Sequence, residues 1–158
     1  WGLGCDASNS SACKKIPYLK KRSDNKSFIL LAPSISFALE FSAELEASQI
    51  EFLESVWPGH VTVIMQANDS LSLSIKAIDN TIAIRVSNHL PIKNLLNIFN
   101  GLMVSTSANI SNFPTLNSLD EVKKIFDDPD VAVYAHDNGD ALKPSSIIDL
   151  KTMEYIRE

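Results

Sequence analysis

Residues 101–109 are Gly-Leu-Met-Val-Ser-Thr-Ser-Ala-Asn, an apolar run that passes directly into a polar turn. The apolar half predicts a strand, and the last five residues supply three hydroxyls and one carboxamide. Such groups, together with free backbone N–H groups, are suited to hold phosphate oxygens or a small zwitterion. The same residue types also form ordinary turns after strands. The segment therefore predicts either a ligand-binding turn or a simple connection.

A basic cluster precedes another apolar run nearer the start of the chain. Lys20, Lys21, Arg22 and Lys26 lie just before residues 28–32, which are Phe-Ile-Leu-Leu-Ala. Four cations within seven residues can form a clamp for an anion. The alternative is a solvated helix end, where positive charge is favoured by the helix dipole.

Composition predicts one globular domain with an uneven charge distribution. The chain has 158 residues, 45% of them hydrophobic and 21% charged, which is ordinary for a globular domain with a real core. The net charge of −5 argues against wrapping nucleic acid over the whole surface. However, six of the 14 basic residues fall between Lys14 and Lys26. This clustering predicts a positively charged cleft on an acidic protein.

The sequence offers no motif for a metal, a membrane or secretion. The two cysteines, Cys5 and Cys13, lack metal-type spacing, and the three histidines are scattered, so we expect no protein-held metal site. No apolar run approaches the roughly 18 residues of a membrane-spanning helix. The first residues do not resemble a signal peptide. We therefore expect a cytoplasmic protein with reduced cysteines and no membrane partner.

Hydrophobic periodicity and breaker residues predict the order of elements. Ser8 or Asn9 is expected to cap the first helix, Pro17 to kink or split it, and Ser118 to open a capping box with Glu121. Helices are expected at 8–21, 34–42, 47–56, 89–99 and 118–126, and strands at 28–32, 61–66, 81–86, 102–105, 131–135, 146–150 and 154–157. The expected fold class is α/β of the α+β type: a single domain, residues 1–158, with a twisted mixed sheet flanked by helices.

Five segments in the right order resemble one known family. They are Lys20-Lys21-Arg22 (its K-x-R motif), Trp57-Pro58-Gly59-His60-Val61-Thr62 (W-P-G-P-x-T), Thr81-Ile82-Ala83-Ile84-Arg85-Val86 (T-x-A-x-R), Ser107-Ala108-Asn109 (S-x-N) and Ser145-Ser146-Ile147-Ile148-Asp149 (S-T-I-I-D). The chain thus resembles the YrdC-like threonylcarbamoyl-AMP synthases, which act in tRNA modification. The resemblance covers essentially the whole chain, and it implies a YrdC-like fold.

The resemblance also implies how the chain relates to the family's full length. The family begins with a strand carrying a P-T-E-T-type string and an active-site Thr before its Y-G-L-G motif, and here Trp1 takes the place of that Tyr. The family also continues past the position of Arg157. We therefore expect residues 1–158 to lack the family's N-terminal strand and C-terminal end.

The reaction implied by the resemblance uses L-threonine, bicarbonate and ATP to make threonylcarbamoyl-AMP, pyrophosphate and water. Mg²⁺ is expected with ATP, although no Asp/Glu pair in the motifs claims it. The product serves tRNA through the threonylcarbamoyl-transferase machinery. The chemistry needs charge neutralisation and positioning rather than a covalent nucleophile, in agreement with the cations and hydroxyls of the motifs.

Residue roles follow from the positions that match the family's motifs. We expect catalytic roles for Lys20, Arg22, Ser107 and Asn109. The residues expected to bind ATP are Arg22, Lys26, Thr81, Ser105, Thr115 and Arg157, and those expected to bind threonine are Arg85, Ser107 and Ser145. Local alternatives stay open: Arg85 can pair with Asp79 or a helix carboxylate, and Ser145 can be a plain turn residue. Trp57 is expected to anchor the core rather than to stack on a base.

The chain departs from the family pattern at four positions. His60 and Ser87 each stand where Pro is usual. Ser27 stands where Pro or Gly is usual, and Asn112 stands where Gly is common. None of these changes removes a charged contact, but they alter turns beside the motifs.

Two other functions compete with the synthase. One is a non-catalytic RNA-binding paralogue of the same fold, which would have no need of a complete K-x-R and S-x-N pair. The other is a domain of a larger protein, such as a carbamoyl-transfer maturation factor.

Overall fold

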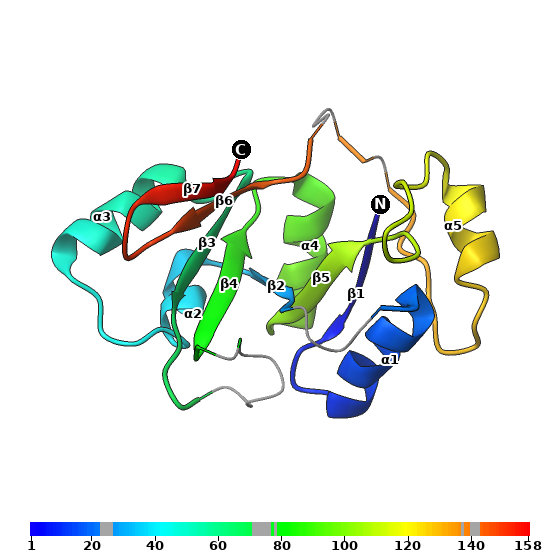
Figure 1. Ribbon diagram of the computed structural model, residues 1–158, viewed down its shortest axis with the longest axis horizontal. Helices are drawn as coiled ribbons and strands as arrows, with labels where there is room; N and C mark the ends of the chain where they lie inside the picture. The colour runs from blue at the N-terminus through cyan, green and yellow to red at the C-terminus, as the bar shows by residue number, and fades with distance from the viewer. Residues whose placement is uncertain (23–26, 71–76, 78, 137, 140–142) are drawn as a thin grey trace.

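The computed structural model describes residues 1–22, 27–70, 77, 79–136, 138–139 and 143–158. Within these residues the chain forms one seven-stranded sheet and five helices (Figure 1). In chain order the elements are β1 (Gly2–Asp6), α1 (Ser10–Lys20), β2 (Ile29–Ala32), α2 (Ile35–Leu39), α3 (Ala47–Val56), β3 (Val61–Gln66), β4 (Thr81–Val86), α4 (Leu90–Phe99), β5 (Met103–Ser107), α5 (Leu119–Ile125), β6 (Ser146–Asp149) and β7 (Glu154–Arg157).

The sheet is mixed, as expected from the sequence. Its strand order is β1-β5-β2-β4-β3-β6-β7. The pairs β2–β4 and β3–β6 are parallel, and the other four pairs are antiparallel. Figure 1 shows α3 near the β6–β7 end of the sheet, and α1 and α5 near the β1 end. The predicted fold class, a single-domain mixed sheet with helices, is confirmed.

One face of the sheet carries the hydrophobic core. Alternate residues of four central strands are buried there: Leu30 and Ala32, Val63 and Met65, Ile82, Ile84 and Val86, and Val104. Helices α1, α2 and α3 add Ile16, Ala38 and Leu53, each of them almost fully buried. Trp57, which follows α3, is buried in the same core, and its Nε1 donates to the Val61 carbonyl oxygen at 2.8 Å. The expectation that Trp57 is a core anchor is confirmed.

The opposite face of the sheet carries the strand-borne candidate residues. Ser105 of β5 lies opposite Ile29 of β2, which lies opposite Ala83 of β4. Because side chains alternate along a strand, Ser107, Thr81 and Arg85 share the face of these three residues. Many side chains on this face are only partly buried. The sheet thus presents them on one accessible surface.

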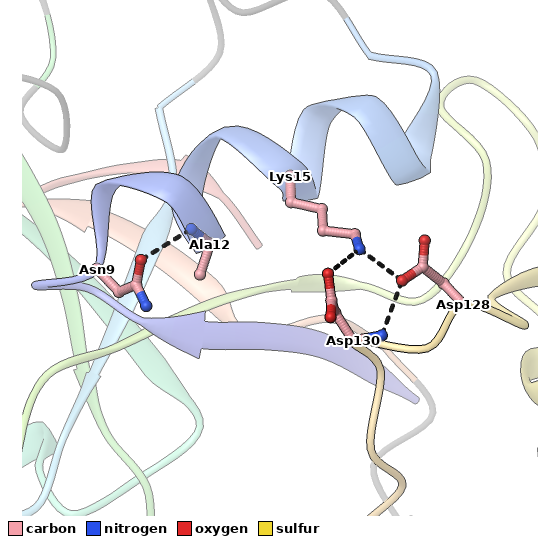
Figure 2. Close-up of polar contacts among 5 residues, drawn as sticks. All are labelled: Asn9, Ala12, Lys15, Asp128 and Asp130. Carbon is pink, nitrogen blue, oxygen red and sulfur yellow. Dashed lines mark hydrogen bonds and ion pairs between the residues drawn. The ribbon is translucent and has the colours of Figure 1, made fainter.

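Helix α1 is continuous and begins as the sequence predicts. Asn9 caps it by accepting a hydrogen bond from the Ala12 N–H at 3.0 Å (Figure 2). Of the kink or split expected at Pro17, the split is wrong, because the helix continues through Pro17 to Lys20. The Pro17 carbonyl instead helps to end the helix, since it accepts the Arg22 N–H at 2.9 Å beyond the left-handed residue Lys21.

Lys15 ties the segment after α5 to α1. Its Nζ donates to Asp128 Oδ1 and to Asp130 Oδ2, both at 2.5 Å (Figure 2). The Asp130 N–H donates to Asp128 Oδ1 at 2.9 Å, so the two carboxylates are held together around the ammonium group. The next residues are thereby placed beside β1 and α1.

Two strand predictions differ from the structure. The predicted strand 131–135 is wrong: these residues have no regular secondary structure, and Val133 and Tyr134 are exposed. Alternating β-branched and aromatic residues favour a strand, but a strand also needs a partner to pair with. Conversely, β1 was not predicted, because Gly-Leu-Gly-Cys-Asp has weak β propensity. It forms by antiparallel pairing with β5.

Most other elements lie within a few residues of their predicted limits. The capping box of α5 is present in both directions, between Ser118 and Glu121. Helix α2 is shorter than predicted and is capped by Ser34, which accepts from the Phe37 N–H at 3.1 Å.

Candidate functional site

The two basic and polar motifs meet at the end of α1. Lys20 is only 3% exposed, although it is a lysine at a helix terminus. Its Nζ donates to the Ser107 carbonyl oxygen, to the Asn109 carbonyl oxygen at 2.8 Å and to Asn109 Oδ1 at 3.0 Å. The Lys20 carbonyl oxygen in turn accepts the Ser111 N–H at 2.8 Å. The side chain of Lys20 thus joins the end of α1 to two residues that lie 87 and 89 positions further along the sequence.

The turn after β5 is also organised from within. Ser107 Oγ donates to Asn109 Oδ1 at 2.6 Å, and Asn109 Nδ2 donates to the Phe113 carbonyl oxygen at 2.6 Å. The carboxamide oxygen therefore accepts from both Lys20 and Ser107, and its orientation is fixed. Ser107 itself is exposed, so its hydroxyl lies at the surface of this network.

Lys20 carries a perturbed charge at the centre of the turn. Burial, and to a smaller extent the nearby Arg22 charge, lower the pKa of Lys20 to about 8. Three oxygen acceptors match the three N–H donors of a lysine ammonium group. The ammonium form is therefore solvated by protein oxygens, and at neutral pH it puts a positive charge under the S-x-N motif.

Arg22 lies between this turn and the start of β2. Its Nη2 donates to the Ser27 carbonyl oxygen at 3.0 Å, and its guanidinium carbon lies 5.3 Å from the centroid of the Phe28 ring. A guanidinium over an aromatic face gains a cation–π attraction. Partial burial lowers the pKa of Arg22, but the group stays charged at neutral pH. Phe28 thus holds the cation beside the first residues of β2.

A small hollow opens next to Phe28 at the start of β4. Its volume is about 240 Å³, and its lining residues are Ser27, Phe28, Ile64, Ala77, Asp79, Thr81, Ile82 and Ala83. Thr81 Oγ1 donates to Asp79 Oδ1 at 2.7 Å, and this bond lowers the pKa of the Asp79 carboxyl. The hollow is therefore mainly apolar, with one hydroxyl–carboxylate pair on its wall.

Arg85 lies near the other end of β4 on the same face. Its Nε donates to the Gly59 carbonyl oxygen at 3.0 Å, and its Nη2 donates to Ser87 Oγ at 3.3 Å. Burial lowers its pKa. The alternative that Arg85 pairs with Asp79 is wrong, because Asp79 accepts from Thr81 instead. Within the described part of the chain no carboxylate pairs with Arg85, so its charge has no counter-ion there.

Ser145 is held by two side chains. It is 6% exposed, and its hydroxyl is hydrogen-bonded to the Thr62 hydroxyl at 2.9 Å. Arg157 donates to the Ser145 carbonyl oxygen from Nη2 at 2.6 Å and from Nε at 3.0 Å. Thr62 ends the motif at residues 57–62, and the sequence assigns it no role. No signal in the sequence identifies it, because its burial and its contact with Ser145 are seen only in the structure.

Some candidate residues are not brought into these contacts. Thr115 is exposed in the connection between β5 and α5, and Ser105 is half-buried on β5. Lys26 lies outside the described residues. A second hollow of about 170 Å³, between β1, α1 and Asp130, contains none of the candidates. Neither hollow contains both Lys20 and Arg85, so a single positively charged cleft stays a prediction.

Three of the four departures from the family pattern have a local role in the structure. His60 Nε2 donates to the Lys143 carbonyl oxygen at 2.9 Å. Nothing in the structure explains Ser27, whose contact with Arg22 uses only its backbone carbonyl oxygen. Ser87 Oγ accepts from a backbone N–H at 3.2 Å. Asn112 has a φ of 66°, and Asn tolerates this left-handed region better than most residues other than Gly.

The part of the chain that the structure describes offers neither a metal-binding cluster nor a membrane-spanning helix. No group of three or more His, Cys, Asp or Glu side chains there could hold a metal ion. No helix among these residues is long and apolar enough to cross a membrane.

These features define a single-domain α/β protein with a cationic, hydroxyl- and amide-rich turn beside an accessible sheet face. The family model Sua5/YciO/YrdC, described as telomere recombination, matches residues 1–158. A curated relative, threonylcarbamoyl-AMP synthase from Vibrio parahaemolyticus, is 34% identical over 160 aligned residues, which cover 100% of this chain and 86% of the relative. The chain therefore belongs to the Sua5/YciO/YrdC family.

Solved structures have the same fold. E. coli YciO superposes with a TM-score of 0.85 at 23% identity, over 99% of this chain and 77% of that one. P. abyssi Sua5, solved in complex with L-threonine, superposes with a TM-score of 0.79 at 24% identity. The superposition covers 95% of this chain and 44% of that Sua5. At these identities the likeness shows the fold alone.

Proposed function

We propose that the protein is an L-threonylcarbamoyladenylate synthase, an adenylyl-transferring enzyme. The observation that carries the proposal is the contact of Lys20 with Ser107 and Asn109, since it joins the K-x-R and S-x-N motifs in one site. Curated relatives from several bacteria, including Vibrio and Buchnera, have the name threonylcarbamoyl-AMP synthase at 32–37% identity. No observation favours the RNA-binding alternative.

The proposed reaction has two steps. The amine nitrogen of L-threonine first forms a bond to the carbon of bicarbonate, and water leaves to give a carbamate. A carbamate oxygen then attacks the α-phosphorus of ATP, and the bond from that phosphorus to the bridging oxygen of the β-phosphate breaks. The products are threonylcarbamoyl-AMP, pyrophosphate and water. Both steps gather negative charge, so fixed cations and oriented donors are the means of catalysis.

Binding of ATP is assigned to the α1–β2 side of the site. The cations of Lys20 and Arg22, with Lys26, neutralise the phosphates, and the Ser107 hydroxyl and Asn109 amide orient them. The mainly apolar hollow beside Phe28 takes the base, which explains why Thr81 matches an ATP-contacting position. Ser105 contacts ATP from β5, the strand that pairs with β2. Further contacts, also assigned by family position, are from Thr115 and Arg157.

Binding of threonine is assigned to the β4–β6 side. Arg85 has no carboxylate counter-ion among the described residues, so it suits the substrate carboxylate. Ser145 and Ser107 supply hydroxyl contacts to the rest of the amino acid. Because the strand-borne candidates share one face of the sheet, we propose that threonine and the phosphates bind on that face and that bicarbonate binds between them.

The remaining partners follow from the reaction. Mg²⁺ is assigned to the phosphates of incoming ATP, because the described residues provide no cluster of ligands for it. The product passes to a threonylcarbamoyl transferase that modifies tRNA, and the site is proposed to act in the cytoplasm, where Cys5 and Cys13 stay reduced.

Pyrophosphate release by the full-length protein tests the proposal. We expect release only when ATP, bicarbonate and L-threonine are all present, and much slower release with 2-aminobutyrate or L-valine. A site built to bond a hydroxyl rejects analogues that lack it. Equal release with L-valine would contradict the threonine assignment, and tight RNA binding without any release would favour the alternative function.

A further inference from the structure

Thr62 is a polar residue in a position that otherwise suits an apolar one. It lies on β3, where it is 0% exposed, and its strand neighbour Val63 is equally buried. Burying a hydroxyl costs free energy unless it is hydrogen-bonded. Among the described residues the partner of the Thr62 hydroxyl is Ser145 Oγ, at 2.9 Å.

The fold aims this pair at the proposed threonine site. Strands β3 and β6 are parallel, with Thr62 opposite Ile147, so Ser145 enters β6 beside Thr62. On the other side of β3, Val63 lies opposite Ile84 of β4, so the next antiparallel pair brings Thr62 beside Arg85. The two hydroxyls and the guanidinium of Arg85 therefore share one region of the accessible face.

Ser145 is restrained in two different ways. Arg157 holds its carbonyl oxygen with two N–H groups and approaches its hydroxyl only at 3.4 Å. The short contact to the hydroxyl is the one from Thr62. A serine hydroxyl has one donor and two acceptor positions. When Thr62 donates to it, the Ser145 proton is left to donate to a ligand.

We propose that Thr62 is a positioning residue, which orients the Ser145 hydroxyl toward the amino-acid substrate without touching that substrate. The proposal rests on the proposed synthase function. Without the Thr62 hydroxyl, Ser145 can rotate, and part of its contribution to threonine binding is lost. The phosphates of ATP are assigned to the other side of the site. Arg157, an assigned ATP contact, is held mainly by the Ser145 carbonyl oxygen, so we expect ATP affinity to depend little on the two hydroxyls.

The test compares Thr62→Val, Thr62→Ser and Ser145→Ala in the full-length protein. Thr62→Val keeps the shape of the side chain and removes the hydroxyl, so we expect the KM for L-threonine to rise about three- to tenfold, the usual effect of one neutral hydrogen bond. We expect the KM for ATP to stay unchanged, and Thr62→Ser to restore the value for threonine. A melting curve for each variant checks that it is folded.

The double variant Thr62→Val/Ser145→Ala separates positioning from a structural role. If Thr62 acts through Ser145, the double variant has the same KM for threonine as Ser145→Ala alone, because the effects of coupled residues are not additive. Multiplied effects, or a folded Thr62→Val protein with an unchanged KM, would overturn the proposal while the wild type remains active. A wild type that releases no pyrophosphate with threonine would overturn both this inference and the proposed function.

Discussion

Replacement of Lys20 by Met tests whether one buried ammonium group holds the two motifs together. Met has a similar length and fits a buried position, but it donates no hydrogen bond. Two of the three acceptors keep another partner: the Ser107 carbonyl oxygen accepts the Asn109 N–H at 3.0 Å, and Asn109 Oδ1 accepts from Ser107 Oγ at 2.6 Å. The Asn109 carbonyl oxygen loses its hydrogen bond from Lys20.

The expected cost follows from that inventory. Leaving one buried acceptor unsatisfied costs about 1–3 kcal/mol. The variant also loses the two other hydrogen bonds of Lys20. Part of that loss is offset because Met carries no charge, and burying the Lys20 charge is unfavourable, as its lowered pKa indicates. We therefore expect Lys20→Met to lower the free energy of unfolding by about 2 kcal/mol, which corresponds to about 4–8 °C in Tm for a chain of this size.

The assay is urea unfolding followed by circular dichroism, with thermal unfolding as a second measurement. Lys15→Met is the matched control, because Lys15 lies on the same helix and also contacts two residues far away in sequence. Its ion pair with Asp130 is solvent-exposed and that with Asp128 is only partly buried, so we expect the two pairs to contribute less than the contacts of Lys20. A Lys20→Met variant as stable as the wild type, or a larger loss of stability in Lys15→Met, would contradict a structural role for the Lys20 ammonium group.

Three further predictions concern charge. The pKa of Lys20 is about 8 in the folded protein and 10.5 for an ordinary lysine, so between these pH values the unfolded chain binds more protons than the folded one. The stability of the wild type relative to Lys20→Met should therefore rise with pH across this window. A flat or falling stability difference in urea unfolding would contradict the burial of the ammonium group. Arg22→Ala should weaken ATP binding about ten- to hundredfold, which is the effect of losing a charge-assisted hydrogen bond. Tyr18→Ala, a control at an exposed position on α1, should leave ATP binding unchanged. Isothermal calorimetry measures both, and an unchanged Kd in Arg22→Ala would remove Arg22 from the ATP site. Arg85→Ala should weaken L-threonine binding by a similar factor and leave the Kd for ATP within about twofold; an equal loss for both ligands would show that Arg85 does not act selectively on the threonine side.

Much of the fold could be predicted because many helices and strands have a hydrophobic pattern or a capping motif within their own sequence. The strand Thr81–Val86 alternates buried and accessible residues, and α5 begins with a capping box that depends only on Ser118 and Glu121. Strand β1 could not be predicted in this way, since Gly2 and Gly4 have low β propensity and the strand depends on its pairing with β5. The segment 131–135 shows the converse, a strong local pattern without a strand partner.

The site could be predicted in its residues but not in its connections. The resemblance identified Lys20, Ser107 and Asn109, and the structure joins them in one network. Pairwise contacts across the chain leave no trace in a single sequence, so the bond between Thr62 and Ser145, 83 residues apart, could not be derived from it. Partners that are backbone carbonyls, such as that of Gly59 for Arg85, are equally invisible because every residue has one.

Direct detection of the product tests the central claim. The full-length protein would be incubated with ATP, L-threonine and carbon-13-labelled bicarbonate, and the nucleotides analysed by mass spectrometry within the lifetime of a carbamoyl adenylate. We expect threonylcarbamoyl-AMP that carries the label, formed together with pyrophosphate, and its loss in Arg85→Ala. Folded protein that binds ATP but forms no labelled adenylate with L-threonine would contradict the proposed synthase function.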